Sequence, residues 1–133
     1  MMVLLTIGLV FAAAAGLLHV FFFYLESMSF TNPSTWKRFG VASQADADVL
    51  APMAYNQGFY NLFLAVGSII GIVLVAAGHT AVGAAIVIFG TASMALAGIV
   101  LISTGRERIR AAAIQFLPAV FALAFTALGL ATR

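Results

Sequence analysis

Hydrophobic residues are concentrated in four long runs along the chain, and polar residues lie mainly between them. The runs cover about residues 3–25, 54–77, 81–103 and 111–131. A transmembrane helix needs about 20 largely apolar residues, so each run is long enough to cross a bilayer. The pattern predicts an all-α fold, an integral membrane four-helix bundle in which residues 1–133 form a single transmembrane domain.

The longest connection joins the first run to the second. Asn32 and Pro33 form a typical helix start, and Gly40 is a typical stop. We therefore expect a short amphipathic interfacial helix between spans 1 and 2. Its indole side chain, Trp36, should lie at the level of the lipid headgroups.

A second short helix is predicted directly after the first. Ser43 and Asp46 have the spacing of a capping box, which satisfies backbone donors at a helix N-terminus. We expect this helix to run to about Ala51, and Pro52 either ends it or begins the second span.

The first run also has features of a secretory signal peptide, because residues 12–16 resemble a cleavage region. However, no Lys or Arg precedes the run, and it continues through Phe21, Phe22 and Phe23. We therefore expect an uncleaved first span that ends at Glu26.

The composition indicates that lipid is the solvent of this chain. Hydrophobic residues make up 64% of its 133 residues, charged residues make up 8%, and the mean hydropathy is +1.15. A soluble domain is about a quarter charged. The chain has no cysteine, which excludes disulfides and thiolate metal sites. We predict no cofactor.

Positive charge is unevenly distributed between the two sides of the predicted bundle. The connections after the first and third spans hold five of the six basic residues: Lys37, Arg38, Arg106, Arg108 and Arg110. Because cytoplasmic loops carry such an excess, we expect residues 26–54 and 104–110 to be cytoplasmic and both termini to lie outside. Membrane orientation accounts for the net charge of +2, so we predict membrane lipid and no nucleic acid as a partner.

Polar side chains in the spans gather near the predicted cytoplasmic ends. His19 and Glu26 belong to the first span and Gln115 to the fourth, and the second span opens with Asn56, Gln57, Tyr60 and Asn61. Unpaired polar groups cost several kcal/mol each in hydrocarbon, so these side chains should face one another. The pattern predicts a polar pocket in the cytoplasmic half of the bundle.

Small residues mark the surfaces expected to pack. The fourth span carries a stripe of mostly small residues at alternating three- and four-residue steps: Gln115, Ala119, Ala122, Thr126 and Gly129. The second span contains a GxxxG motif at Gly67 and Gly71. Small residues allow membrane helices to approach closely, so both surfaces should face other helices.

Two interpretations stay open for the ionisable residues. Glu26 is either an interfacial carboxylate paired with Lys37, Arg38 or water, or an intramembrane acid that faces Asn56, Gln57 or Gln115 and transfers protons. His19 is either a structural hydrogen-bonded residue or a functional one, namely a proton-transfer partner, a hydrogen-bond donor to a ligand or a metal ligand. A metal site is not predicted, because one His and one carboxylate almost two helical turns apart do not form a typical ligand set.

Four stretches of the chain resemble a known family. They are residues 19–26 (HVFFFYLE), 36–40 (WKRFG), 56–65 (NQGFYNLFLA) and 115–119 (QFLPA). Together they resemble the family catalogued as domain of unknown function 1304, whose members are small four-span membrane proteins of bacteria and fungi. The resemblance implies the same architecture, and we expect the bacterial cytoplasmic membrane as the location. The family name implies no activity.

The predicted function is binding of a small amphipathic or lipid-soluble molecule in the polar pocket. Glu26 and His19 are the candidate catalytic residues of an acid/base isomerase or hydrolase, if turnover takes place. The candidate ligand-binding residues are Asn56, Gln57, Tyr60, Asn61 and Gln115. Alternative functions are a proton-coupled transporter or channel subunit and a structural membrane subunit, and a homo-oligomer stays open.

Overall fold

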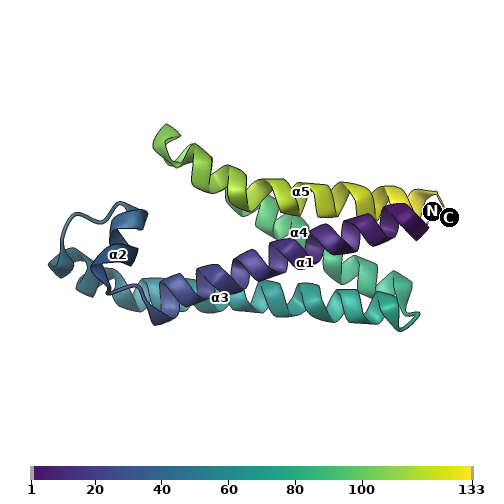
Figure 1. The fold of residues 1–133 in the computed structure, drawn as a ribbon, viewed down its shortest axis with the longest axis horizontal. Helices are drawn as coiled ribbons and strands as arrows, with labels where there is room; N and C mark the ends of the chain where they lie inside the picture. The colour runs from purple at the N-terminus through teal and green to yellow at the C-terminus, as the bar shows by residue number, and fades with distance from the viewer. Residues whose placement is uncertain (1, 133) are drawn as a thin grey trace. The chain divides into compact units, whose positions relative to one another are not determined.

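The four hydrophobic runs form four long helices in a computed structural model, which describes residues 2–132 (Figure 1). These helices are α1 (Met2–Phe23), α3 (Gln44–Ala76), α4 (Thr80–Ser103) and α5 (Ile109–Ala131). The shorter elements are the π-helix η1 (Tyr24–Met28), α2 (Pro33–Trp36) and the 3-10 helices η2 (Lys37–Phe39) and η3 (Arg106–Arg108). Every element of residues 2–132 is helical, which confirms the all-α prediction.

All four long helices have the length and the composition of membrane spans. Together with the turns that continue them, the candidate spans are Met2–Met28, Gln44–Ala76, Thr80–Ser103 and Arg106–Ala131. The chain is therefore described below as an integral membrane protein.

The chain divides into two compact units, which we describe separately. The terminal unit consists of Met1–Leu18 and Leu64–Arg133, and the central unit consists of His19–Phe63. The terminal unit contains most of α1, the second half of α3, and all of α4 and α5. The central unit contains the end of α1, η1, α2, η2 and the first half of α3.

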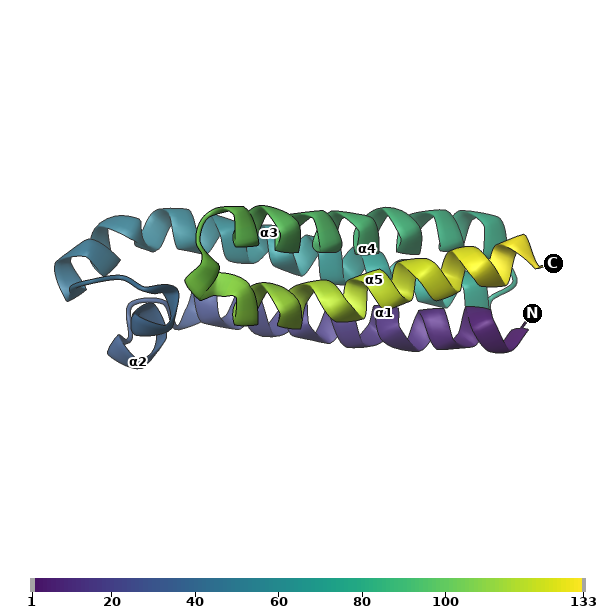
Figure 2. The ribbon, with the colours of Figure 1, turned by 90° about the horizontal axis from the view of Figure 1, so that it is seen from above.

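Small side chains form the core of the terminal unit. Two clusters of buried residues lie within it: Ala15, Met94, Ala95 and Ala119 in one, and Ala12, Val87 and Ala122 in the other. The start of α1 runs along the end of α5 (Figure 2), where a Cβ atom on Gly129 would lie 2.6 Å from the backbone nitrogen of Leu5. The predicted stripe on the fourth span is thus buried at Ala119, Ala122, Thr126 and Gly129.

Only one glycine of the GxxxG motif lies at a close helix contact. A Cβ atom on Gly71 would lie 2.8 Å from the carbonyl oxygen of Gly83 on α4, and one on Gly83 would lie 2.6 Å from the oxygen of Gly71. No heavy atom lies within 4 Å of the corresponding position on Gly67. The prediction that both glycines face another helix is therefore wrong for Gly67 among the described residues.

The central unit has its own small core, and it buries Trp36. The indole ring is 7% exposed and packs with Phe30 and Ala47, and its Nε1 donates to Oε1 of Gln44 at 3.1 Å. The ring therefore packs within the central unit, and its predicted level at the lipid headgroups stays a prediction. Packing against α3 removes its apolar surface from solvent, and Gln44 satisfies its single donor.

Helix α3 is uninterrupted from Gln44 to Ala76, with Pro52 inside it. The backbone nitrogen of Asp46 donates to Oγ of Ser43 at 3.1 Å, which caps the helix as the sequence predicts. Pro52 removes one backbone donor, but the hydrogen bonds on either side continue the helix. The predicted second short helix and the second span are therefore one helix of 33 residues.

Candidate functional site

The first span ends in a π-helical turn, and Glu26 lies inside this turn. The turn covers Tyr24–Met28, and the backbone nitrogen of Ser29 donates to the carbonyl oxygen of Tyr24 at 3.0 Å. Such turns are rare and occur frequently at functional sites. The sequence pattern did not predict it, because a single wider turn leaves the hydrophobic run unchanged.

Gly58 on α3 allows the π-helical turn to lie directly against the helix backbone. A Cβ atom at this position would overlap Oγ of Ser27 and would lie 3.1 Å from the carbonyl oxygen of Phe23. The Ser27 hydroxyl donates to the backbone oxygen of Tyr55 at 2.8 Å. Sequence reasoning missed both Ser27 and Gly58, although a glycine inside a run of amides is a signal of close backbone approach.

Glu26 and Asn61 form the central polar contact of this region. Nδ2 of Asn61 donates to Oε2 of Glu26 at 2.7 Å. Asn61 is 7% exposed, and Glu26 is half-buried. An acid on the first span does face an amide on the second, but the partner is Asn61 rather than Asn56, Gln57 or Gln115.

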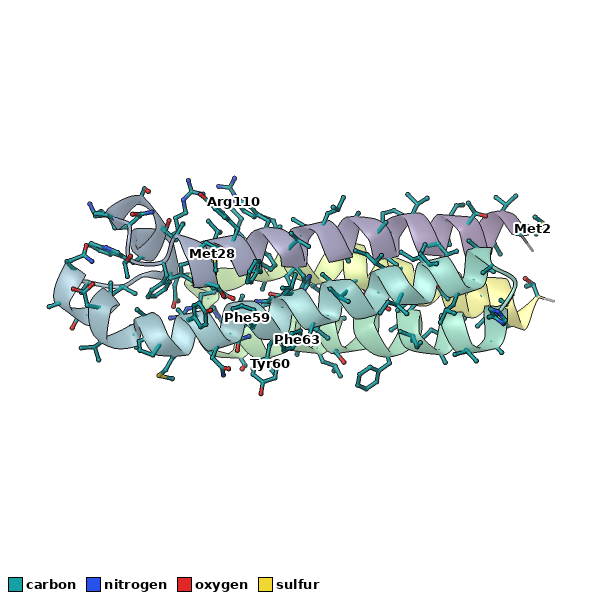
Figure 3. All side chains as sticks on the ribbon, turned by 90° about the horizontal axis from the view of Figure 1, so that it is seen from below. Met2, Met28, Phe59, Tyr60, Phe63 and Arg110 are labelled. Carbon is teal, nitrogen blue, oxygen red and sulfur yellow. The ribbon has the colours of Figure 1, made fainter. Side chains whose placement is uncertain are left out.

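The other polar side chains at the start of the second span point elsewhere. Asn56, Gln57 and Tyr60 are exposed, whereas Gly58 and Asn61 are buried. Figure 3 shows Tyr60 projecting outward from α3. With about 100° between successive residues, one turn of helix can direct only one or two of these side chains toward the π-helical turn.

His19 is fully buried within α1, where its ring contacts Phe22 edge-on with 5.3 Å between centroids. The seven-residue spacing from His19 to Glu26 places both on one face only if the helix is regular. The π-helical turn changes the rotation per residue before Glu26 is reached. A direct proton-transfer pair therefore has no support from helix periodicity.

Gln115 belongs to the terminal unit and is partly buried. Its Nε2 donates to the carbonyl oxygen of Met94 on α4 at 3.4 Å. This contact joins two adjacent helices, as amide side chains commonly do in membrane proteins. It favours a structural role for Gln115.

Aromatic rings form a separate set of contacts between the end of α1 and α3. The ring of Phe23 meets Phe59 edge-on at 5.1 Å, and Phe59 is also 5.0 Å from Tyr55 and 6.2 Å from Phe63. Figure 3 shows Phe59 and Phe63 on the same helix as Tyr60. We call Phe23, Tyr55, Phe59 and Phe63 the aromatic row.

No group of three or more metal-ligating side chains is found among residues 2–132.

These observations define a four-span, all-α integral membrane protein with a carboxylate–amide contact at one end of its first two spans. The chain belongs to the family described as Protein of unknown function (DUF1304), whose family model matches residues 4–127. The resemblance found in the sequence is thereby confirmed. Comparisons with curated proteins and with solved structures give no match.

Proposed function

We propose that this protein binds a small amphipathic or lipid-soluble molecule whose polar head contacts Glu26 and Asn61. The observation that carries the proposal is their hydrogen bond, formed inside a π-helical turn that packs on Gly58. Interhelical packing alone needs neither an ionisable group nor a π-helical turn. Carboxylates within spans are rare, and they commonly mark binding or transfer sites.

The depth of the contact suits an amphipathic ligand. Helix α3 has 33 residues and is therefore about 50 Å long, compared with about 30 Å for the hydrocarbon layer. Counting about 20 residues back from Ala76 reaches residue 57. The Glu26–Asn61 contact then lies near the boundary between hydrocarbon and headgroups, where the head of an amphipath lies.

Neighbouring side chains complete the proposed site. Gln57 is exposed and lies one helical turn before Asn61, on the same side of α3, so it is available to a polar head at this contact. The aromatic row offers apolar surface to the tail. Proton transfer is the chemistry that this site favours: Glu26 would act as the acid or base, and the amide of Asn61 would stabilise the charge that develops.

We propose that the site faces the cytoplasm of a bacterial cell, with residues 26–54 and 104–110 inside and both termini outside. The support is the basic charge of these connections. Because the chain has no native cysteine, a single cysteine at exposed Ser34 can be labelled cleanly in intact cells. A membrane-impermeant maleimide should label it only after lysis; labelling of intact cells would contradict this orientation.

The binding proposal is tested with photoreactive dodecyl amphipaths in nanodiscs of neutral lipid. Three probes with hydroxyl, amine and carboxylate heads are each added to the full chain, and labelled peptides are mapped by mass spectrometry. We expect at least one probe to label residues 23–28 or 55–63. Glu26→Leu and Asn61→Leu should reduce this labelling about tenfold, because each removes a polar partner of the head.

The matched controls are Glu107→Leu and Asn32→Leu, which make the same side-chain changes at exposed positions outside the site. Both should label like the parent. Circular dichroism and gel filtration establish that each variant is folded. Folded Glu26→Leu and Asn61→Leu variants that label as strongly as the parent would contradict the proposed function.

A further inference from the structure

A line of exposed side chains runs along α3 in the central unit. It consists of Val49, Met53, Asn56, Tyr60 and Phe63, which we call the α3 line. Its four apolar or aromatic members are between 58% and 78% exposed. Successive members are four, three, four and three residues apart, so all of them project from one side of the helix. Figure 3 shows one of them, Tyr60, projecting outward.

The α3 line lies on a different side of the helix from the Glu26–Asn61 contact. Asn61 directly follows Tyr60, and successive side chains of a helix differ by about 100° in direction. Asn61, Gly58 and Ala47 are buried, and Ala47 belongs to the small core of the central unit. The α3 line is therefore covered neither by this core nor by the proposed binding site.

Neither lipid nor water suits the whole α3 line. Counting back from Ala76 places the boundary of the hydrocarbon near residue 57. Val49 comes eight residues earlier, so it lies about 12 Å beyond the acyl chains, whereas Phe63 lies among them. Water does not favour the exposed side chains of Val49 and Met53. A partner that covers the line has to be apolar on both sides of the boundary, and α3, with its 33 residues, is itself such a helix.

Asn56 indicates that this partner is a second copy of the chain. Its side chain is exposed, and no hydrogen bond of its amide is described among residues 2–132. An amide carries both a donor and an acceptor, so it is complementary to a second amide. Two copies of a membrane protein have the same orientation, so their α3 helices run parallel at equal depth. Each Asn56 then faces its counterpart, as a polar residue does when it fixes the register of two parallel helices.

We infer that two copies of this chain form a dimer through the α3 line, with a two-fold axis along the membrane normal. Each member of the line faces the same residue of the second copy. The Asn56 amides donate to each other's carbonyl oxygens, and Met53, Tyr60 and Phe63 supply the apolar contacts. The inference goes beyond the proposed function, because each copy keeps its own Glu26–Asn61 contact on another side of α3.

The test is disulfide formation between single cysteines, which the absence of native cysteine makes unambiguous. Met53→Cys and Tyr60→Cys are placed on the α3 line. Tyr55→Cys is the control, because Tyr55 is half exposed at the same depth but projects from another side of the helix. Each full chain is reconstituted in liposomes at high lipid excess, oxidised with copper phenanthroline and separated on a non-reducing gel.

We expect both cysteines on the line to give about tenfold more covalent dimer than the control, because a disulfide needs Cβ atoms about 3.8 Å apart. Equal yields at all three positions would indicate random collision and would overturn the inference. A higher yield at Tyr55→Cys would place the interface elsewhere, and a chain that stays monomeric throughout would exclude a second copy as the partner.

The Asn56 pair has its own readout. Asn56→Leu, added to each cysteine variant, should preserve the dimer but loosen its register, because an apolar residue at this position no longer favours one alignment. The ratio of covalent dimer at Met53→Cys to that at Tyr55→Cys should then fall several-fold. An unchanged ratio would overturn the amide pair.

A second substitution tests the dimer without any cysteine on the line. Val49→Lys places two like charges opposite each other outside the hydrocarbon, where a monomer tolerates a lysine. Energy transfer between chains labelled at an added Ser34→Cys should fall several-fold in liposomes. Asn32→Lys is the control, since it adds the same charge at an exposed position away from the line, and it should leave the transfer unchanged. Equal transfer in both variants would contradict an interface at Val49.

Discussion

The two units of this protein hold their helices together by different means. In the terminal unit, α3 and α4 meet at Gly71 and Gly83, where the two backbones approach closely beside the apolar side chains of Val75 and Val87. In the central unit, the π-helical turn meets α3 at Gly58 as well, but two side-chain hydrogen bonds, from Ser27 and from Asn61, are added.

The difference shows which features are needed for packing and which are not. Small residues suffice for close approach of membrane helices, as the terminal unit demonstrates. That unit even buries the hydroxyls of Ser68 and Thr126 without a described hydrogen-bond partner. The carboxyl–amide contact between Glu26 and Asn61 therefore exceeds what packing requires, which is why we propose a function for it. Four substitutions test this comparison.

The largest effect is expected at the glycine contact of the terminal unit. Gly83→Ala should lower the free energy of unfolding by about 3 kcal/mol, because the new Cβ atom would lie 2.6 Å from backbone atoms of Gly71 and Val75. Unfolding in mixed detergent micelles measures the change. Gly67→Ala is the control, since its Cβ meets no atom within 4 Å, and it should be neutral or stabilising. Equal destabilisation by both changes would refute the close contact.

A slightly smaller effect is expected at the corresponding glycine of the central unit. Gly58→Ala should cost about 2 kcal/mol, because its Cβ atom would overlap Ser27 and crowd the π-helical turn. Adding Ser27→Ala should restore part of the loss in the same unfolding assay, since the backbone of Phe23 remains close. Full tolerance of Gly58→Ala would mean that the turn does not lie on this helix.

The polar contact should contribute less to stability than to binding. Asn61→Leu leaves Glu26 without its donor and should lower the free energy of unfolding by about 1.5 kcal/mol. Asn56→Leu makes the same change five residues earlier at an exposed site and should stay within about 0.5 kcal/mol. If the two variants unfold alike, Asn61 has no special role in this contact.

The smallest effect has the opposite sign. Ser68→Ala should stabilise the protein by about 1 kcal/mol, because it removes a fully buried hydroxyl without a described partner. Ser93→Ala is the comparison: its hydroxyl already donates to the carbonyl of Phe89 at 2.8 Å, so little should change. Destabilisation by Ser68→Ala would show that this hydroxyl has a partner after all.

Local patterns predicted the elements of the fold better than their contacts. The length of each apolar run was enough to predict four spans, and Gly40 and Ser43 act as the expected stop and cap. Pro52 was misleading because a proline can either end a helix or be accommodated inside a longer one. Here the helix continues past it to Ala76. Trp36 has a packing role that the pattern did not predict, because an amphipathic side chain suits an interface and a small core equally well, and Phe30 and Ala47 provide that core.

The sequence predicted which polar residues gather near the ends of the first two spans, but only partly which of them contact one another. Among residues 2–132, Glu26 does meet an amide of the second span, as polar groups in lipid must find partners. Which amide it meets depends on helix rotation, and a π-helical turn alters that rotation without a clear signal in the residue pattern. Asn56 and Gln57 consequently remain exposed.

The amino-acid sequence by itself determined the solvent of this protein, the number of its spans and the kinds of polar groups near one end, because these follow from the length and hydropathy of each run. Only the tertiary structure decided that Glu26 contacts Asn61, and that Gly71 rather than Gly67 meets α4. The physical reason is that hydrophobicity is additive along a segment, whereas a contact depends on the rotation and spacing of two segments together.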